Sequence, residues 1–92
     1  MKSKVISLPV LLLLVGSCMI HAQSARQYYR AGEDFFDNMN FRDAIEQYTK
    51  AVEMDPDYDK AYIQRANAYA RLNDYERAAA DYDRAIVFNE KD

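Results

Sequence analysis

The stretch FRDAIEQYTKAVEMD, residues 41–55, returns in outline as YERAAADYDRAIVFN, residues 75–89, which is an offset of 34 positions. Identical residues at this offset are Tyr28/Tyr62, Ala44/Ala78, Tyr48/Tyr82 and Ala51/Ala85. Chemically similar pairs keep the same register: Phe35/Tyr69, Asn40/Asp74, Phe41/Tyr75, Lys50/Arg84, Val52/Ile86, Met54/Phe88 and Asp55/Asn89. Self-similarity at a fixed period of this size is typical of stacked helical or mixed units, and such units usually serve as binding surfaces.

Apolar residues recur at helical spacing on both sides of this stretch. Tyr28, Gly32, Phe35 and Met39 lie four, three and four positions apart and would line one face of an α-helix. The stretches 41–54 and 75–90 each carry a similar stripe, and no alternating run indicates a strand. We therefore predict an all-α fold of four helices, at roughly 25–38, 41–54, 59–72 and 75–90, joined by short loops.

The segment Asp55-Pro56-Asp57 separates the second predicted helix from the third. Proline disfavours the α conformation in the residue before it, so the second helix should end there. Asp57 or Asp59 can then cap the next helix with a side-chain oxygen.

This arrangement resembles the tetratricopeptide repeat (TPR) family, whose pattern is W-x2-L-G-x2-Y…A-x3-F…P with a period of about 34 residues. The matching residues in the first repeat are Tyr28, Ala31, Gly32, Phe35, Ala44, Tyr48 and Pro56. Those in the second repeat are Tyr62, Ala66, Tyr69, Ala78 and Tyr82. Two positions depart from the pattern: Arg65 stands where an apolar residue is usual, and Glu90 stands where the proline is expected. The resemblance implies a right-handed α-solenoid of two TPR-type helical hairpins, at 25–58 and 59–92, that binds other proteins.

Small residues stand where the two helices of each repeat would cross. Gly32 and Ala66 lie on the first helices, and Ala44 and Ala78 take the partner side. A larger side chain at Gly32 would hold the helix axes apart. The repeated tyrosines would fill the gaps between helices and keep their hydroxyls in water: Tyr28, Tyr48, Tyr62 and Tyr82.

Residues 1–22 have the layout of a secretory signal peptide. Lys2 and Lys4 precede an apolar run from Val5 to Val15, and small residues follow it. Cleavage after Ala22 would leave Gln23 as the first residue of a periplasmic or secreted protein. Polar residues and a proline interrupt the run, whereas a transmembrane anchor needs about 18 or more continuous apolar residues.

Cys18 provides an alternative to simple export. Residues 15–18, Val-Gly-Ser-Cys, resemble the lipobox of bacterial lipoproteins, in which the cysteine thiol receives diacylglycerol and becomes residue one. Residues 1–17 would then be the signal, and the protein would be anchored to a membrane. Met19 and Ile20 continue the apolar stretch beyond the cysteine, which favours soluble export. The chain has no second cysteine, so it can form no internal disulfide.

Composition argues against several other functions. Removing Lys2 and Lys4 with the signal changes the net charge from −3 to −5, and the remaining basic residues are scattered among carboxylates. This balance argues against nucleic-acid binding, which needs clustered cations. The single histidine, His21, lies at the signal boundary, so we expect no catalytic triad and no histidine-based zinc site. We predict a protein without enzyme activity, metal or cofactor.

The TPR resemblance implies that the first helix of each repeat lines a concave groove. Helical phasing places six candidate peptide-binding residues there: Tyr29, Glu33, Phe36, Ile63, Asn67 and Arg71. The apolar members would lie outside the core of a single repeat and contact an extended or helical peptide, or else a neighbouring chain or a further repeat. Some TPR proteins hold a C-terminal carboxylate with a Lys/Asn clamp. Tyr29 and Glu33 do not supply that clamp, so we do not expect this ligand.

The predicted C-terminal helix supports a second hypothesis. TPR-like stacks usually need about three or more repeats for stability. Here the sequence given stops at Asp92, so Tyr82, Ile86 and Phe88 would be partly uncovered, and an apolar patch of this kind often marks an interface. The protein is therefore either an exported adaptor that binds a protein segment in its groove, or an assembly unit of a membrane-associated complex, with homo-oligomers formed through this helix. The chain could also be the N-terminal part of a longer TPR protein.

Overall fold

The computed structural model describes residues 24–91, and the side chains of residues 24–87. The described part contains four helices: the first helix at 24–37, α2 at Phe41–Met54, α3 at Asp59–Arg71 and α4 at Tyr75–Lys91. Each end lies within one residue of its predicted position, and the prediction of an all-α fold is confirmed. The predicted signal peptide at 1–22 and the candidate lipidation site Cys18 lie outside the described residues.

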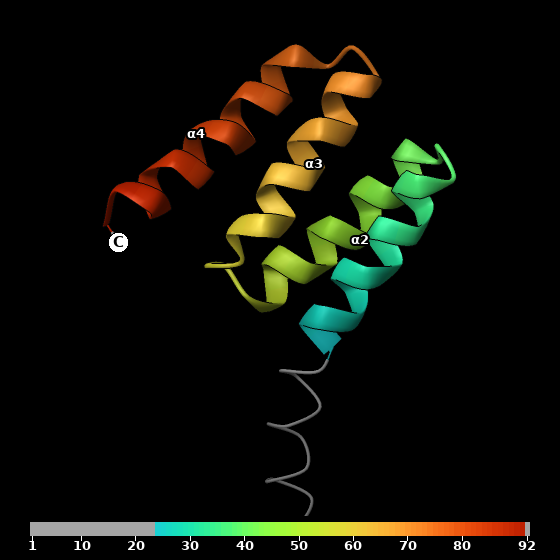
Figure 1. Ribbon diagram of the computed structural model, residues 1–92, viewed down its shortest axis with the longest axis horizontal. Helices are drawn as coiled ribbons and strands as arrows, with labels where there is room; N and C mark the ends of the chain where they lie inside the picture. The colour runs from blue at the N-terminus through green and yellow to red at the C-terminus, as the bar shows by residue number, and fades with distance from the viewer. Residues whose placement is uncertain (1–23, 92) are drawn as a thin grey trace, which may run out of the picture.

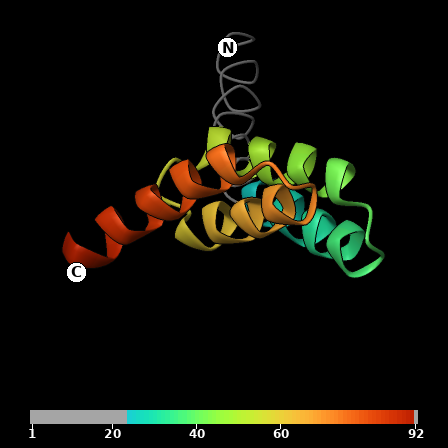
Figure 2. The ribbon, with the colours of Figure 1, turned by 90° about the horizontal axis from the view of Figure 1, so that it is seen from above.

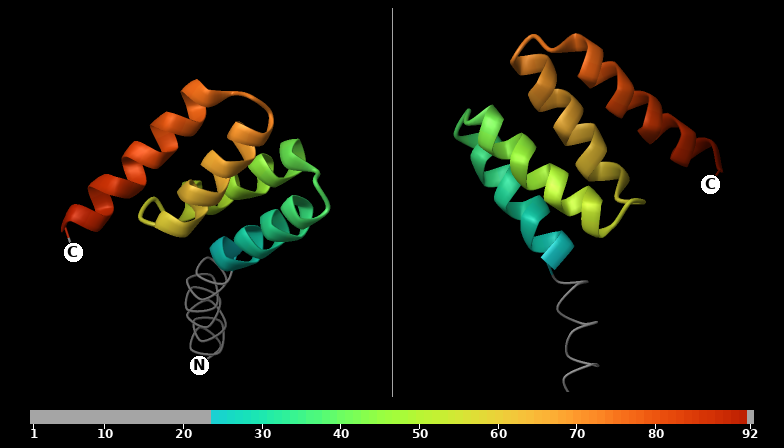
Figure 3. Two further views of the ribbon diagram at one scale, coloured as in Figure 1. Left: turned by 45° about the horizontal axis from the view of Figure 1, so that its top comes forward. Right: turned by 180° about the vertical axis from the view of Figure 1, so that it is seen from behind.

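The four helices form two hairpins, the first helix with α2 and α3 with α4 (Figure 1). α3 lies between α2 and α4 and contacts both, whereas α2 and α4 do not contact each other. The view from above shows two layers, with the first helix and α3 below α2 and the start of α4 (Figure 2). The view from behind shows that the helices follow one another in space in chain order (Figure 3).

Alanines dominate the interfaces between these helices. Five of them are buried with an exposed fraction of 0%: Ala44, Ala51, Ala61, Ala66 and Ala68. Ala78 and Ala85 are nearly as deep, and Val52 and Tyr62 join Ala51 and Ala61 in one apolar cluster between α2 and α3. Small side chains allow close approach of the helices, and Ala44, Ala66 and Ala78, which were predicted to lie at the helix crossings, are all buried.

Gly32 is buried against the ring of Tyr48. A Cβ atom at Gly32 would lie 2.5 Å from the Cε1 atom of Tyr48, which is closer than such atoms can approach. The space beside the glycine is therefore filled by an aromatic ring rather than by Ala44. Tyr48 is completely buried, and its hydroxyl donates a hydrogen bond to Glu33. The prediction that the tyrosine hydroxyls stay in water is wrong for this residue.

The two hairpin turns have the same backbone geometry. Met39 has a φ of 64° and Asn73 a φ of 63°, so both residues are in the left-handed region. The N–H of Asn40 donates to the carbonyl of Phe35 at 2.8 Å, and the N–H of Asp74 donates to that of Tyr69 at 2.9 Å. These bonds close the ends of the first helix and α3 as in a Schellman motif. Met39, predicted to extend the apolar stripe, instead lies past the helix end and is mostly exposed.

The connection from α2 to α3 differs from the predicted cap. The N-cap residue of α3 is Tyr58, and no side chain caps this helix. The carboxylate of Asp55 accepts a hydrogen bond from the N–H of Asp57 at 3.1 Å, which closes an Asx turn. Asp59 already belongs to α3 and accepts from the N–H of Lys60 at 2.8 Å. The prediction that Asp57 or Asp59 is the capping residue is therefore wrong.

Candidate functional site

A line of hydrogen bonds crosses both hairpins. Glu33 and Asn67 occupy equivalent positions on the first helix and α3. Glu33 accepts a hydrogen bond from the hydroxyl of Tyr48, and the Oδ1 atom of Asn67 accepts one from the hydroxyl of Tyr82. Gln64 joins the two, because its Nε2 donates to Glu33 at 2.8 Å and its Oε1 accepts from Asn67 at 2.8 Å. We call these five residues the polar ladder.

The polar ladder fixes the orientation of two predicted groove residues. Glu33 and Asn67 are half-buried and are brought to neighbouring positions through Gln64. Burial, together with the hydrogen bond to Glu33, raises the pKa of Tyr48 far above the ordinary tyrosine value, so its hydroxyl remains protonated and continues to donate. A carboxylate and an amide held in this way need little ordering when a ligand binds.

The aromatic groove candidates are already packed within the protein. Tyr29 stacks on Tyr58 with ring centres 5.1 Å apart and lies 5.8 Å from the ring of Tyr48. Burial raises the pKa of both Tyr29 and Tyr58. Phe36 meets Phe41 edge-on at 5.2 Å. Tyr29 and Phe36 therefore contact the second helix of their own hairpin, and the expectation that they lie outside the core of a single repeat is not met.

The remaining groove candidates lie on α3. The guanidinium carbon of Arg71 is 6.0 Å from the ring centre of Phe36 and 5.4 Å from that of Phe41, so this exposed residue joins α3 to the first hairpin by cation–π contacts. Ile63 is half-buried. The six candidates thus lie on the two first helices of the hairpins, and their role in binding a peptide stays a prediction.

Arg65, the departure from the family pattern, links three helices. Its Nε and Nη2 atoms donate to the two carboxylate oxygens of Asp81 on α4, each at 2.7 Å. Its Nη1 donates to the hydroxyl of Thr49 on α2 at 3.2 Å. The hydrogen bonds to Asp81 raise the pKa of Arg65, and Asp81 is 6% exposed. The charge that departs from the family pattern therefore belongs to a bidentate ion pair between the half-buried Arg65 and the buried Asp81.

Two cation–π contacts repeat at the same offset. The Nζ atom of Lys50 lies 5.6 Å from the ring centre of Tyr28, and the guanidinium carbon of Arg84 lies 5.0 Å from that of Tyr62. The Arg65 guanidinium carbon is also 5.5 Å from the centre of the Tyr62 ring. Each of the two tyrosine rings therefore has a basic side chain from the second helix of its hairpin over it.

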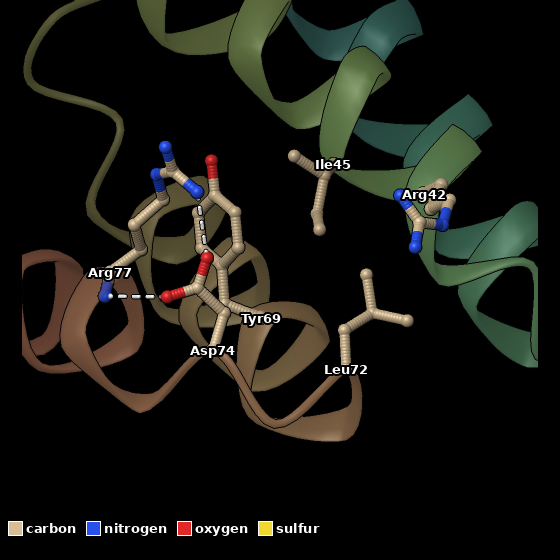
Figure 4. Close-up of a pocket in the computed structure, with 6 residues that line it drawn as sticks. All are labelled: Arg42, Ile45, Tyr69, Leu72, Asp74 and Arg77. Carbon is tan, nitrogen blue, oxygen red and sulfur yellow. Dashed lines mark hydrogen bonds and ion pairs between the residues drawn. The ribbon is translucent and has the colours of Figure 1, made fainter.

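A furrow between α2 and α4, with α3 as its floor, was not predicted from the sequence. Its central hollow has a volume of about 340 Å³ and is shown in Figure 4; the residues that line it are Arg42, Ile45, Tyr69, Leu72, Asp74 and Arg77. Asp74 accepts hydrogen bonds from the side chain of Arg77 at 2.8 Å and from its backbone N–H at 3.3 Å. Both bonds lower the pKa of Asp74, and the side-chain bond raises the pKa of Arg77. We call this surface the α2/α4 furrow.

Residues 24–91 offer little sign of other kinds of site. No group of three or more His, Cys, Asp or Glu side chains gathers there in a way that could hold a metal ion. No helix in the same range combines the length and apolar composition that a membrane crossing requires.

The family model described as "Tetratricopeptide repeat" matches residues 23–92, and the chain therefore belongs to the tetratricopeptide repeat family. Helical repeats of this class present extended binding surfaces to other proteins.

Several curated proteins are similar to parts of the chain. DnaJ homolog subfamily C member 7 homolog of Schizosaccharomyces pombe is 37% identical over 62 residues, 63% of this chain and 13% of its own length. Human DnaJ homolog subfamily C member 7 is 48% identical over 42 residues, 46% of this chain and 8% of its own length. Hsp70-Hsp90 organizing protein 2 of Arabidopsis thaliana is 33% identical over 55 residues, 60% of this chain and 10% of its own length. The chain thus spans only a small part of each relative.

Proposed function

We propose that this protein is a non-enzymatic interaction module, with repeats at 25–58 and 59–92, that binds an extended or helical segment of a partner protein along the first helix and α3. The observation that carries the proposal is the polar ladder. It holds Glu33 and Asn67 in fixed orientations on the two helices that line the groove in this family. Such preorganisation lowers the entropy lost on binding.

The surroundings of the ladder fit a peptide ligand. Arg26 and Lys60 are a further pair at the repeat offset, and both are exposed. Ile63 and Phe36 are half-buried, so part of the apolar surface of each remains exposed and can contact a ligand. We therefore favour a segment with one apolar anchor and neighbouring carboxylates. The name of one relative, Hsp70-Hsp90 organizing protein, indicates a protein that brings other proteins together, which supports a binding role.

The test is selection of ligands from a random peptide display library on the immobilised protein, followed by calorimetric titration of the selected peptides. We expect Ile63→Glu and Arg71→Glu to weaken binding at least about tenfold, because the first places a charge on an apolar residue of the groove face and the second reverses a charge there. The matched control is Ile86→Glu on α4, which should leave peptide affinity unchanged. Selected peptides whose affinity responds to none of the groove variants, or a failure to select any peptide, would contradict the proposal. Circular dichroism checks that each variant is folded.

A second candidate function is assembly through α4. Tyr82 is 36% exposed and Ile86 53% exposed, although both are large apolar residues on the described part of this helix. We propose that this face joins copies of the chain, or a partner, in a larger complex. Sedimentation equilibrium of the wild type and of Ile86→Asp tests this. A lower mass for the variant supports assembly, and identical monomer masses contradict self-association.

Export is the third part of the proposal and rests on the N-terminal sequence. Lys2, Lys4 and the apolar run that follows support secretion with cleavage after Ala22. The alternative is lipidation of Cys18 and anchoring to a membrane. Intact mass spectrometry of the native protein from soluble and membrane fractions distinguishes them. A soluble chain starting at Gln23 supports export, and a membrane-bound chain heavier by an acylated Cys18 supports the anchor. A full-length cytosolic chain starting at Met1 would contradict both.

A further inference from the structure

The α2/α4 furrow is a consequence of how the hairpins stack. α3 packs against α2 on one side and α4 on the other, and α2 and α4 make no contact across it. The central hollow shares Arg42 and Leu72 with a second hollow near Met39 and Phe41. It shares other lining residues with a third hollow near Thr49 and Ala80. Three adjoining hollows therefore follow the gap between the two helices.

The lining combines cationic and aliphatic groups. Arg42 lies on the α2 side, and its guanidinium group makes no hydrogen bond or ion pair within the described part of the chain. Arg77 stands on the α4 side, with one guanidinium nitrogen bound to Asp74 and its other donors available. The side chains of Ile45 and Leu72 lie between the two sides, as Figure 4 shows.

Two guanidinium groups against one carboxylate give the central hollow a net positive charge. The chain as a whole has a net charge of −3 at pH 7, so this hollow differs in sign from the rest of the molecule. Asp43 lines the second hollow, and in the third hollow the charge of Asp81 is balanced by Arg65, so the adjoining hollows add no net positive charge for a ligand with a larger negative charge, such as a phosphate. A single carboxylate beside an aliphatic group fits both the charge and the apolar surface.

We propose that the α2/α4 furrow is a second binding site, which takes a short peptide segment with one acidic side chain next to aliphatic ones. The ligand carboxylate lies between the guanidinium groups of Arg42 and Arg77 and accepts their hydrogen bonds. The flanking aliphatic side chain covers Ile45 and Leu72, and Leu72 is partly exposed in the free protein. This site lies on a different surface from the groove of the first helix and α3, so each can be tested without the other.

The experiment is an NMR titration of the isotope-labelled full chain with the peptide acetyl-Leu-Glu-Leu-amide. The matched probe is acetyl-Leu-Gln-Leu-amide, which has the same shape without the charge. We expect amide shifts at Ile45, Tyr69 and Leu72, and roughly tenfold weaker binding of the glutamine peptide, because the charge-assisted hydrogen bonds are lost. Arg42→Gln should weaken binding of the glutamate peptide by a similar factor. The variant should not change the stability of the fold, because the Arg42 side chain is exposed and makes no hydrogen bond.

Arg30→Gln on the first helix is the control, since it removes the same charge from an exposed position outside the furrow. It should leave binding unchanged. Equal affinity for the two peptides, no shifts at any accessible concentration, or insensitivity to Arg42→Gln would overturn the proposal. Shifts confined to the first helix and Ile63 would also overturn it, and they would support the groove of the proposed function instead.

Discussion

Tyr48 and Tyr82 hold the same position in the two hairpins, and each donates its hydroxyl to the first helix of its own hairpin. Tyr48 is 0% exposed, whereas Tyr82 is 36% exposed. The exposed fraction differs in the same way at the next pair of equivalent positions, because Val52 is buried and Ile86 is half exposed. Tyr48 packs on the first helix beside Gly32, and α3 covers Val52 through Ala61 and Tyr62, whereas no described helix covers the matching side of α4. Burial in this protein is therefore decided by the neighbouring repeat as much as by the residue itself.

The strongest test of this comparison is to introduce an aspartate at equivalent positions of α2 and α4 and to compare the losses of stability. Val52→Asp places a carboxylate in the apolar cluster with Ala61 and Tyr62, and we expect a loss of about 3 kcal/mol or more in unfolding free energy. Ile86→Asp should cost no more than about 0.5 kcal/mol, because the side chain is half exposed. Urea unfolding followed by circular dichroism measures both. Equal losses would mean that α4 is covered in solution.

Gly32 tests the packing around the buried tyrosine. We expect Gly32→Leu to cost about 3 kcal/mol, because even its Cβ atom would overlap the ring of Tyr48. The control is Ala79→Leu on the exposed side of α4, which should change stability by less than about 0.5 kcal/mol. Thermal melting is the measurement. A melting curve for Gly32→Leu that matched the wild type would show that the first helix and α2 do not meet as described.

Removal of single hydroxyls compares the two ends of the polar ladder. Tyr48→Phe takes a donor away from the half-buried carboxylate of Glu33, and we expect a loss of about 1.5 kcal/mol. Tyr82→Phe removes an exposed bond to the neutral amide of Asn67 and should cost about 0.5 kcal/mol. Chemical denaturation of the two variants gives the difference. The reverse order of losses would show that burial does not strengthen the ladder.

The smallest effect concerns the two left-handed turn residues. Met39 has a β-carbon and a long side chain in a conformation that asparagine tolerates better, and Asn73 stands at the equivalent position. We expect Met39→Asn to stabilise the protein by up to about 1 kcal/mol. Asn73→Met should destabilise it by a similar amount. Differential scanning calorimetry is sensitive enough to detect both. A loss of stability for Met39→Asn would contradict this account and indicate that the exposed Met39 side chain makes stabilising contacts.

The helices could be predicted from the sequence because their residues repeat. Tyr28, Ala44 and their partners at an offset of 34 gave helix ends within one residue of those observed. Helical phasing also placed Glu33 and Asn67 on corresponding faces, and the structure brings them together through Gln64. Local periodicity is sufficient for such features, because it records which face of a helix is covered.

Features that join different helices could not be predicted in this way. Arg65 looked like a departure from the pattern because its partner Asp81 is on another helix and has no counterpart in the first hairpin, where Gln47 stands. The α2/α4 furrow depends on the distance between two helices that do not touch, which no periodic pattern encodes. The cap of α3 was predicted wrongly because Tyr58 occupies the N-cap position, so that Asp57 lies before it and Asp59 is already inside the helix.

Arg65 has a consequence for the order of folding. Thr49 and Asp81, its two hydrogen-bond partners, are each 16 residues away along the chain, one on either side. Either contact closes a loop of the same length, so the entropy of closure favours neither. The contact with Asp81 lies within the second hairpin, and the contact with Thr49 joins the two hairpins, so the second hairpin can form either before or after α3 docks on α2. Because all of these contacts are short in sequence, the two hairpins should form quickly, without a long-range nucleus.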